Sequence, residues 1–372
     1  MPTRDELRML QALPLSLKIR MTKRRILDWI KEFGEDGVYL SWSGGKDSTV
    51  LRHIIMQDFP GVVSVFVDTG LEYPEIRRFV NATKDRGEPV EILRPAMRFD
   101  EVIKTLGYPI IGKRQADTIE LARKNMGAGK YSLRLRLLGI TPEEAEANGW
   151  KIPPDDLLQR YENAADGSKF SVEHHKKLLY ADFKVSAKCC DVMKKKPASE
   201  YQRRTGRMPI IATMAQESMV RESAWLKNGC NAFNAKHPSS QPMSFWTGND
   251  VLEYIKTYDV EIASVYGEVV YSNNPDQIRL EELTDENIGR DRLCTTGCDR
   301  TGCIFCGFGA HLEKGESRFE RLKRTHPRQY EYCIGGGEYN EDGIWQPNKQ
   351  GLGMGHVFDE LNRIYGDGFI RY

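Results

Sequence analysis

The chain has 372 residues, of which 40% are hydrophobic and 29% are charged; this is enough apolar material for a core and excludes an extensively disordered chain. Lys and Arg total 54 and Asp and Glu total 53, so the charge balance excludes polyanion binding over the whole surface, and any such site must be local. The first residues contain no signal-peptide stretch, and no window reaches the roughly 20 apolar residues of a membrane span, so we expect a cytoplasmic protein with no membrane partner.

The first half of the chain alternates between helical and strand patterns. Residues 18–33 carry apolar residues at helical spacing, and VYLSW (38–42) has the pattern of a short buried strand. A helix over 49–59, a strand over 62–68, a helix over 74–87 and a strand over 89–95 follow. Strands that alternate with helices predict an α/β fold with a doubly wound, mostly parallel sheet, which binds ligands at the carboxyl ends of its strands.

The rest of the chain predicts two additions to this sheet. Residues from about 115 to 180 are polar and helix-prone, so we expect a helical insertion there, and the α/β pattern resumes at 209–215 and continues to 260. Glycine and cysteine become frequent toward the C-terminus, as in a small metal-stapled module. The predicted domains are an N-terminal helical segment (1–35), a nucleotide-binding α/β domain (36–265) and a C-terminal cysteine-rich module (266–372).

The stretch SWSGGKDSTV (41–50) lies where the first strand turns into the first helix of this pattern. Gly44 and Gly45 allow successive backbone N–H groups to face one concavity at a helix N-terminus, which is a cradle for phosphate. Lys46 adds a mobile positive charge, Ser43 and Ser48 add hydroxyl groups, and Asp47 would cap the helix or help to hold Mg²⁺. The spacing fits neither the Walker pattern nor G-x-G-x-x-G, and the alternative is a capped turn without a ligand.

Here the sequence resembles a known family. SGGKDS resembles the PP-loop of the adenine-nucleotide alpha hydrolases, which hold the pyrophosphate of ATP. FVDTGLEYPE (66–75), TMAQESMVR (213–221) and QPMSFWTGNDVLEYI (241–255) resemble motifs of the branch that contains phosphoadenosine phosphosulfate (PAPS) reductases, the ATP sulfurylase small subunit and the ATP pyrophosphatases of DNA phosphorothioation. The resemblance covers most of residues 38–266 and implies ATP and Mg²⁺ as ligands.

Further candidate residues follow from the positions of these motifs. Asp68, Thr69 and Gly70 fall at the end of the second predicted strand, where a carboxylate would bind Mg²⁺ or ribose. Arg221 ends the third motif and is placed to contact an anionic group, although a surface helix arginine is the alternative. We therefore expect Lys46, Asp47 and Arg221 to be the catalytic residues.

Six of the eight cysteines are clustered, while Cys230 and Cys333 stand alone, and this clustering predicts a metal site rather than disulfides in an intracellular protein. KCCDVMKKKP (188–197) and RTGCIFCGFG (300–309) resemble the two cysteine pairs of adenylyl-sulfate (APS) reductases, which jointly ligate a [4Fe–4S] cluster. The resemblance implies Cys189, Cys190, Cys303 and Cys306 as ligands, with Cys298 as the competitor. Zinc bound by Cys294, Cys298, Cys303 and Cys306 stays open as an alternative. Cys333 lies in YEYCIGGG, which would be a loop presenting a thiol or a simple turn.

Two features favour an ATP pyrophosphatase over a sulfonucleotide reductase. The resemblance implies a degraded PP-loop in the reductases, whereas SGGKDS is intact here. Their C-terminal Glu-Cys-Gly-Leu-His segment does not occur in residues 310–372. We therefore expect an enzyme that cuts ATP to AMP and pyrophosphate and so activates an acceptor for sulfur transfer. APS or PAPS reduction, and nucleotide and cluster sensing without turnover, are the alternatives.

A basic stretch supports a nucleic acid as the acceptor. Residues 181–207 contain eight Lys or Arg and three acids, a local net charge of +5, which would track phosphates, with Tyr201 available to stack on a base. Charge compensation of an anionic cluster and nucleotide explains the same excess. DNA or tRNA as the acceptor and a cysteine desulfurase as the sulfur donor are the partners that this hypothesis implies.

Overall fold

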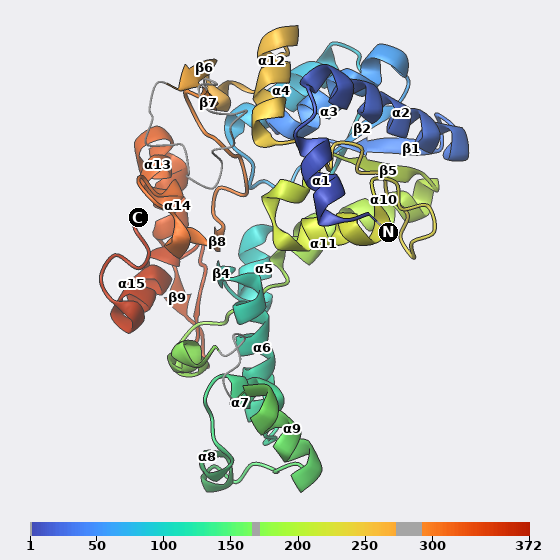
Figure 1. Ribbon diagram of the computed structural model, residues 1–372. Coiled ribbons are helices and arrows are strands. Elements are labelled where there is room, and N and C mark those ends of the chain that lie inside the picture. Colours follow the sequence, from blue (N-terminus) through green and yellow to red (C-terminus); the bar gives the residue numbers. More distant parts are fainter. Residues whose placement is uncertain (1, 166–171, 273–291) are drawn as a thin grey trace. The chain divides into compact units, whose positions relative to one another are not determined.

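The computed structural model describes residues 2–165, 172–272 and 292–372, and it divides the chain into two compact units (Figure 1). Unit 1 contains Met1–Pro95 and Lys196–Gly302, and unit 2 contains Ala96–Lys195 and Cys303–Tyr372. Parts of the predicted insertion (166–171) and of the predicted C-terminal module (273–291) lie outside the described residues.

Unit 1 is built on a four-stranded, fully parallel sheet in the order β3-β2-β1-β5. Its elements are α1 (Arg4–Gln11), α2 (Leu15–Phe33), β1 (Val38–Ser41), α3 (Lys46–Asp58), β2 (Val63–Val67), α4 (Pro74–Asp85), β3 (Val90–Leu93), α10 (Lys196–Thr205), β5 (Met208–Ile211), the 3₁₀ turn η3 (Ala215–Glu217), α11 (Met219–Asn228), α12 (Gly248–Tyr258), the 3₁₀ turn η4 (Ser264–Tyr266) and the antiparallel pair β6 (Val269–Ser272) and β7 (Arg292–Thr295). The predicted parallel α/β sheet is therefore observed.

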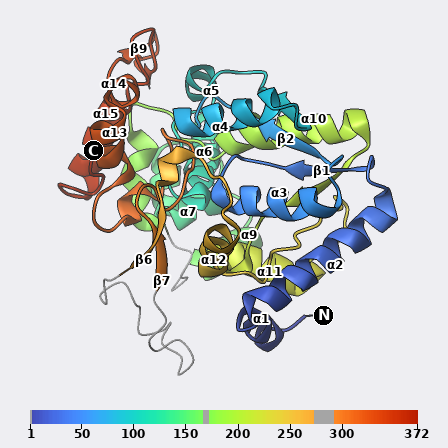
Figure 2. The same cartoon turned by 90° about the horizontal axis from the view of Figure 1, so that it is seen from above.

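Helices cover both faces of this sheet. On one face, Tyr39 of β1 and Val65 of β2 pack against Tyr201 of α10, with ring centroids 5.1 Å apart for the two tyrosines. Helix α3 runs along the other side of β1, where α2 and α12 pack against it (Figure 2). Because all four strands run in the same direction, the segments that follow β1, β2 and β5 leave the sheet at the same edge.

A buried ion pair joins the N-terminal helical segment to unit 1. Lys18 of α2 is buried, and its Nζ lies 2.6 Å from Asp250 Oδ2 on α12 and 2.6 Å from the Gln11 carbonyl oxygen. Removing one partner of a buried pair leaves the other charge uncompensated. We expect Lys18→Met to lower the free energy of unfolding by about 3 kcal/mol, whereas Lys31→Met, at an exposed position of the same helix, should change it by less than about 0.5 kcal/mol. Urea denaturation of both variants measures this, and equal losses would contradict it.

Unit 2 is mainly helical. Its elements are α5 (Phe99–Thr105), β4 (Ile110–Ile111), α6 (Lys113–Gly127), α7 (Leu133–Leu137), α8 (Pro142–Ala147), α9 (Asp155–Ala165), the 3₁₀ helix η1 (Glu173–Tyr180), the π-helix η2 (Asp191–Lys195), β8 (Gly307–Phe308), the 3₁₀ turn η7 (Ala310–Leu312), α13 (Arg318–Thr325), α14 (Pro327–Ile334), β9 (Glu338–Tyr339), β10 (Trp345–Gln346) and α15 (Met354–Tyr365). β4 pairs with β8 in parallel and β9 pairs with β10 in antiparallel orientation.

This division differs from the predicted domain boundaries. The predicted insertion (115–180) is part of unit 2 together with residues 303–372, while residues 292–302 of the predicted C-terminal module belong to unit 1. The reason is a set of backbone hydrogen bonds: β7 pairs with β6, and the amides of Gly297 and Cys298 donate to the carbonyls of Tyr266 and Val265. Composition marked the cysteine-rich region as one module, whereas the hydrogen bonds of residues 292–298 join that part of it to unit 1.

The part of the chain that the structure describes has no helix whose length and apolar character would let it cross a membrane.

Candidate nucleotide site and thiol cluster

The loop that follows β1 is shaped by a glycine at a position that disfavours any side chain. Gly44 has φ 68°, and a Cβ atom there would lie 2.8 Å from Ile76 Cγ2 and 3.0 Å from Val80 Cγ2 of α4. The loop backbone is therefore pressed against α4 before it enters α3. Its hydroxyl groups stabilise the turn: Ser48 Oγ accepts a hydrogen bond from the Ser43 amide at 3.2 Å and donates to the Gly45 carbonyl at 3.0 Å.

The close approach at Gly44 can be tested by substitution. Gly44→Ala adds left-handed strain of about 1 to 2 kcal/mol and an overpacking cost of about 1 to 3 kcal/mol against Ile76 and Val80. Gly87→Ala is the matched control, because Gly87 also has positive φ (84°) but has no atom within 4 Å of the added Cβ. We expect Gly44→Ala to be the more destabilising of the two in urea denaturation, and equal losses would contradict the packing of the loop on α4.

Lys46 begins α3 and is largely buried, with 9% of its surface exposed. Its Nζ donates a hydrogen bond to the Asp299 carbonyl oxygen at 2.9 Å, and its backbone amide donates to the Tyr266 hydroxyl at 3.2 Å. The Tyr266 hydroxyl also shares a hydrogen bond with Thr301 Oγ1. A hydroxyl oxygen and a carbonyl oxygen thus occupy the acceptor positions that the loop would offer to phosphate oxygens.

The side chain of Asp47 has an unsatisfied oxygen. Asp47 Oδ1 is buried and has no hydrogen-bond partner among the described residues, although Lys46 Nζ lies 3.5 Å from it. A buried carboxylate oxygen without a hydrogen-bond donor suits a hard cation such as Mg²⁺. The residue present therefore fits the magnesium ion that the sequence predicts.

The segment that follows β2 lies at the same edge of the sheet. Asp68 Oδ1 accepts a hydrogen bond from the Gly70 amide at 3.2 Å, and its Oδ2 pairs with Arg77 at 3.0 Å. Thr69 donates to Glu72 through both its amide and its hydroxyl, at 3.1 and 2.8 Å. Gly70 has φ 75°, which closes this turn. Asp68, Thr69 and Gly70 thus form an ordered turn beside the SGGKDS loop, as the order of the strands requires.

Arg221 reaches the same edge from the segment after β5. It lies in the first turn of α11 and forms an ion pair with Glu217. Burial lowers the pKa of Arg221, as does the charge of Arg300, while Asp47 opposes both. The Arg221 side chain is 40% exposed and pairs with Glu217, and the charge of Asp47 acts on its pKa.

Five residues of this site were not predicted from the sequence. Tyr266 and Asp299 contact Lys46, and Thr301 shares a hydrogen bond with the Tyr266 hydroxyl. Glu217 pairs with Arg221 and with Arg300. Arg300 lies 2.7 Å from Glu217 Oε1. Burial raises the pKa of Tyr266 to about 12, so its hydroxyl keeps its proton at neutral pH. These residues lie in irregular segments far from the loop in sequence. The signals available in the sequence were the glycines of two turns, Tyr266-Gly267 and Arg300-Thr301-Gly302.

Unit 2 brings together four cysteines, which we call the thiol cluster: Cys189, Cys190, Cys303 and Cys306. Burial raises the pKa of Cys189 most. The neighbouring thiols of Cys190, Cys303 and Cys306 raise it further, whereas the positive charge of Lys194 lowers it. Burial likewise raises the pKa of Cys306, and Cys190 also raises it. The positive charges of Arg318 and Lys113 lower it. The four thiols are therefore close enough to interact electrostatically. Thiols that are gathered and partly buried beside basic residues fit the ligand set of an iron–sulfur cluster.

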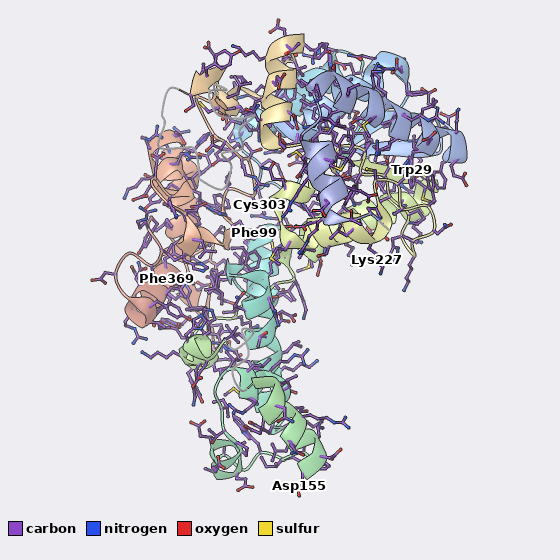
Figure 3. The ribbon with its side chains drawn as sticks, viewed as in Figure 1. Trp29, Phe99, Asp155, Lys227, Cys303 and Phe369 are labelled. Atoms are coloured by element: carbon purple, nitrogen blue, oxygen red, sulfur yellow. The ribbon has the colours of Figure 1, made fainter. Side chains whose placement is uncertain are left out.

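The local structure explains how the two cysteine pairs are held. Cys189 and Cys190 directly precede the π-helix η2, a distortion that is frequent at functional sites. The Cys306 amide donates to the Cys303 carbonyl at 3.1 Å, and Arg318 donates to the Cys306 carbonyl at 2.9 Å. Phe305, which lies between Cys303 and Cys306 in the sequence, stacks on Phe99. Figure 3 labels Phe99 and Cys303.

The other four cysteines are placed differently. Cys294 and Cys298 belong to unit 1, where the Cys298 amide donates to the Val265 carbonyl. Cys230 is buried beside Ser244 Oγ at 3.2 Å. Cys333 is fully buried against Met354, and burial raises the pKa of its thiol, so it does not present a reactive thiolate.

Two further findings bear on the predicted metal. Within residues 2–165, 172–272 and 292–372, no group of three or more His, Cys, Asp or Glu side chains is arranged to hold a single metal ion. In a [4Fe–4S] cluster, by contrast, each cysteine binds a different iron. The described cysteines form no disulfide.

The basic stretch 181–207 corrects one prediction. Tyr201 is only 2% exposed and packs in the core of unit 1, so it is not available to stack on a base. Some of the basic residues pair with nearby acids: Lys188 with Glu120, and Arg204 with Glu91 at 2.8 Å. The sequence indicated an aromatic residue among basic ones, but only packing decides which face of α10 it occupies.

Comparison with known proteins supports the sequence resemblance for the region that holds the loop. Residues 37–125 match the family model of the phosphoadenosine phosphosulfate reductase domain. A phosphoadenosine 5'-phosphosulfate reductase from Thiocapsa roseopersicina is 32% identical over 95 residues, which are 25% of this chain and 36% of that protein. A reductase of the same name from Xylella fastidiosa (strain M23) is 32% identical over 77 residues, which are 21% of this chain and 32% of that protein. The chain thus spans about a third of the length of these relatives.

Among solved structures, the phosphate complex of phosphoadenylyl-sulfate (PAPS) reductase from Candida auris aligns with a TM-score of 0.34 and 12% identity, over 71% of this chain and 91% of that one. The match over residues 37–125 confirms the predicted resemblance: this part of the chain is similar to the phosphoadenosine phosphosulfate reductase domain.

Proposed function

We propose that this protein is an ATP pyrophosphatase that transfers adenylate to an acceptor and so activates it for sulfur transfer. The observation that carries the proposal is the intact SGGKDS loop. The ammonium group and the backbone amide of the buried Lys46 both donate to oxygen acceptors there, and Asp47 keeps a buried oxygen without a hydrogen-bond donor. A loop built in this way supplies both the positive charge and the magnesium ligand that a pyrophosphate leaving group requires.

The proposed reaction uses the residues of unit 1. ATP would bind with its β- and γ-phosphates on residues 43–48, and Asp47 would hold the Mg²⁺ ion. An acceptor oxygen attacks the α-phosphorus and loses its proton to solvent, and the bond from that phosphorus to the α,β-bridging oxygen breaks. Lys46 stabilises the negative charge that develops on the departing pyrophosphate. With water as the acceptor, the products are AMP and pyrophosphate.

Lys46 must change partners for this step. Its ammonium group now donates to a neutral carbonyl oxygen, that of Asp299. A phosphate oxygen is a stronger acceptor for this ammonium group, because the phosphate oxygen carries negative charge whereas the carbonyl oxygen is neutral. Tyr266 and Thr301 lie beside Gly45, where an added Cβ would be 3.3 Å from the tyrosine hydroxyl and 3.6 Å from the threonine hydroxyl. We expect both hydroxyls to donate to the nucleotide when it occupies the loop.

The thiol cluster would hold a [4Fe–4S] cluster, with Cys189, Cys190, Cys303 and Cys306 as the four ligands. Such a cluster supplies electron transfer or a site that binds sulfur. The protein's own contribution there is charge: Lys194, Lys113 and Arg318 act on the thiols in the direction that favours the thiolate. Sulfur transfer to the adenylated acceptor is the part of the proposal that rests on the resemblance alone.

A sulfonucleotide reductase is the second candidate, because the aligned relatives are named PAPS reductases. The burial of Cys333 argues against it, since no thiol in residues 310–372 is exposed to attack a sulfonucleotide. A third candidate is a sensor that binds ATP without turnover.

One experiment separates these functions. Anaerobically purified protein is incubated with Mg²⁺–ATP, alone or with DNA or tRNA, and in parallel with PAPS or APS and a dithiol reductant. AMP and pyrophosphate in excess over the protein support the proposal, and stimulation by one polymer identifies the acceptor class. Release of sulfite from PAPS or APS, with ATP unchanged, would replace it with reduction. ATP that binds but is not cut in any mixture would identify a sensor.

A further inference from the structure

Two arginines of unit 1 share one carboxylate. Glu217 Oε1 accepts a hydrogen bond from Arg300 Nη2 at 2.7 Å, and its Oε2 pairs with Arg221. The Glu217 side chain is only 13% exposed, and Oε2 also accepts from the Met214 amide at 3.0 Å, so the backbone helps to fix this carboxylate. A single negative charge therefore holds two guanidinium groups.

This arrangement leaves positive charge uncompensated. Burial lowers the pKa of Arg221, and the charge of Arg300 lowers it further, so the two guanidinium groups repel each other. Asp47 attracts Arg221, but two other carboxylates near the pair are engaged: Glu222 forms an ion pair with α1, and Asp299 accepts a hydrogen bond from a hydroxyl group of β7. An anion that joins two like charges held around one carboxylate is stabilised by both.

The chain neighbours of Arg300 place it beside the SGGKDS loop. The Asp299 carbonyl accepts the hydrogen bond from Lys46 Nζ at 2.9 Å. Thr301 Oγ1 lies 3.6 Å from the position that a Cβ atom on Gly45 would take. Arg300 therefore belongs to a segment that contacts the predicted pyrophosphate cradle through the residues on both of its sides.

Both guanidinium groups are accessible to a ligand. The Arg300 side chain is 68% exposed and that of Arg221 is 40% exposed. Within the described part of the chain, the ion-pair partner of Arg300 is Glu217. A guanidinium group has more N–H donors than one carboxylate takes up, and its planar fork matches the oxygens of a phosphate group. Each arginine can therefore bind an anion and still keep its contact with Glu217.

We propose that Arg300, together with Arg221, binds the terminal phosphates of ATP and so selects a triphosphate over nucleotides without a β,γ-pyrophosphate. This inference rests on the proposed function, because it takes residues 43–48 as the pyrophosphate cradle. A triphosphate carries more negative charge than Lys46 and a magnesium ion bound to Asp47 neutralise together. The arginine pair supplies further positive charge through charge-assisted hydrogen bonds. Glu217 is a positioning residue that orients both forks.

Equilibrium binding to the full-length protein, purified without oxygen, tests this inference. The ligands are α,β-methylene-ATP, which cannot be cut between its α- and β-phosphorus atoms, AMP and APS, each titrated in the presence of Mg²⁺ and followed by calorimetry. Arg300→Gln should weaken binding of the ATP analogue about tenfold, as expected for the loss of hydrogen bonds to a charged group. Binding of AMP and APS should change by less than about twofold, because both lack the terminal phosphates.

Two further variants complete the test. Arg300→Lys keeps the charge but not the fork, so its affinity for the analogue should lie between those of Arg300→Gln and the unchanged protein. Arg24→Gln is the matched control, because the Arg24 side chain is also 68% exposed and also pairs with a carboxylate, that of Asp28 at 3.1 Å. It should leave all three affinities unchanged.

Each outcome decides the proposal. A loss confined to the ATP analogue, partly restored by Arg300→Lys and not seen in Arg24→Gln, supports it. An equal loss for all three nucleotides, or a larger loss for APS, would overturn it, since Arg300 would then act on the whole site or on a sulfate group. Unchanged binding of the analogue by Arg300→Gln refutes this inference and leaves the proposed function standing. Failure of the unchanged protein to bind the analogue refutes both.

Discussion

Lys46→Ala is expected to lower the rate at which AMP and pyrophosphate form by at least about a hundredfold, the loss typical of removing one donor to a developing negative charge. Lys46 is the cation at the start of α3, and burial within the loop keeps its ammonium group next to the cradle. Lys84→Ala, at an exposed position on α4, is the matched control and should leave the rate unchanged. Radiolabelled ATP and chromatography of the products measure both.

Lys46→Arg separates charge from geometry. Arginine keeps the positive charge but presents a planar fork in place of a compact ammonium group. The loop is tight, since Gly44 is pressed against α4 and Lys46 is mostly buried. We therefore expect partial activity, between that of Lys46→Ala and that of the unchanged protein. Full activity in Lys46→Ala, with its folding confirmed by circular dichroism, would remove Lys46 from the mechanism.

The second large effect is expected at the thiol cluster. Cys303→Ser should reduce bound iron from about four atoms per chain to nearly none, because a four-thiolate cluster loses one of its ligands. Cys298→Ser is the matched control: Cys298 belongs to unit 1, while the four thiols that interact with one another belong to unit 2. Iron, zinc and acid-labile sulfide are measured on protein purified without oxygen.

Cysteine variants also test the zinc alternative. If Cys294, Cys298, Cys303 and Cys306 bound a single zinc ion, Cys298→Ser would release the metal and Cys189→Ser would retain it. A [4Fe–4S] cluster bound by the four thiols of unit 2 requires the opposite pattern, with Cys189→Ser losing iron and Cys298→Ser keeping it. Zinc in stoichiometric amount with no labile sulfide would contradict the iron–sulfur assignment directly.

The sequence predicted the part of the site that follows regular strands. Strand, glycine-rich turn and helix occur in that order at residues 38–58, and the parallel order of β1, β2 and β5 brings the SGGKDS loop, Asp68 and the segment of Arg221 to one edge. Local periodicity and the general rule for parallel sheets suffice for this. The four thiols of unit 2 were likewise predicted, although by resemblance rather than by spacing.

The residues that close over the loop could not be predicted in this way. Asp299 lies 253 residues from Lys46, and it contributes a backbone carbonyl, which carries no signal in the side-chain sequence. Tyr266 acts through one hydroxyl at the end of a 3₁₀ turn. Contacts of this kind depend on irregular backbone that no periodic pattern describes.

Tyr201 is a residue for which the sequence predicted a role that its burial excludes. An aromatic residue among basic ones indicated base stacking, yet the ring is inserted against Tyr39 and Val65 and its hydroxyl accepts a hydrogen bond from Arg207 at 2.9 Å. The sequence defines the composition of α10, whereas the position of the sheet decides which residues of the helix are covered.

The fate of the α-phosphate tests the proposed reaction most directly. Anaerobically purified protein is given Mg²⁺ and ATP labelled at the α-phosphorus, and the labelled product is identified over many turnovers. Cleavage between the α- and β-phosphates predicts that the label appears in AMP or in an adenylated acceptor, with an equal amount of pyrophosphate. Label that appears in ADP, or that stays in ATP, would contradict the assignment of residues 43–48 as a pyrophosphate-releasing loop.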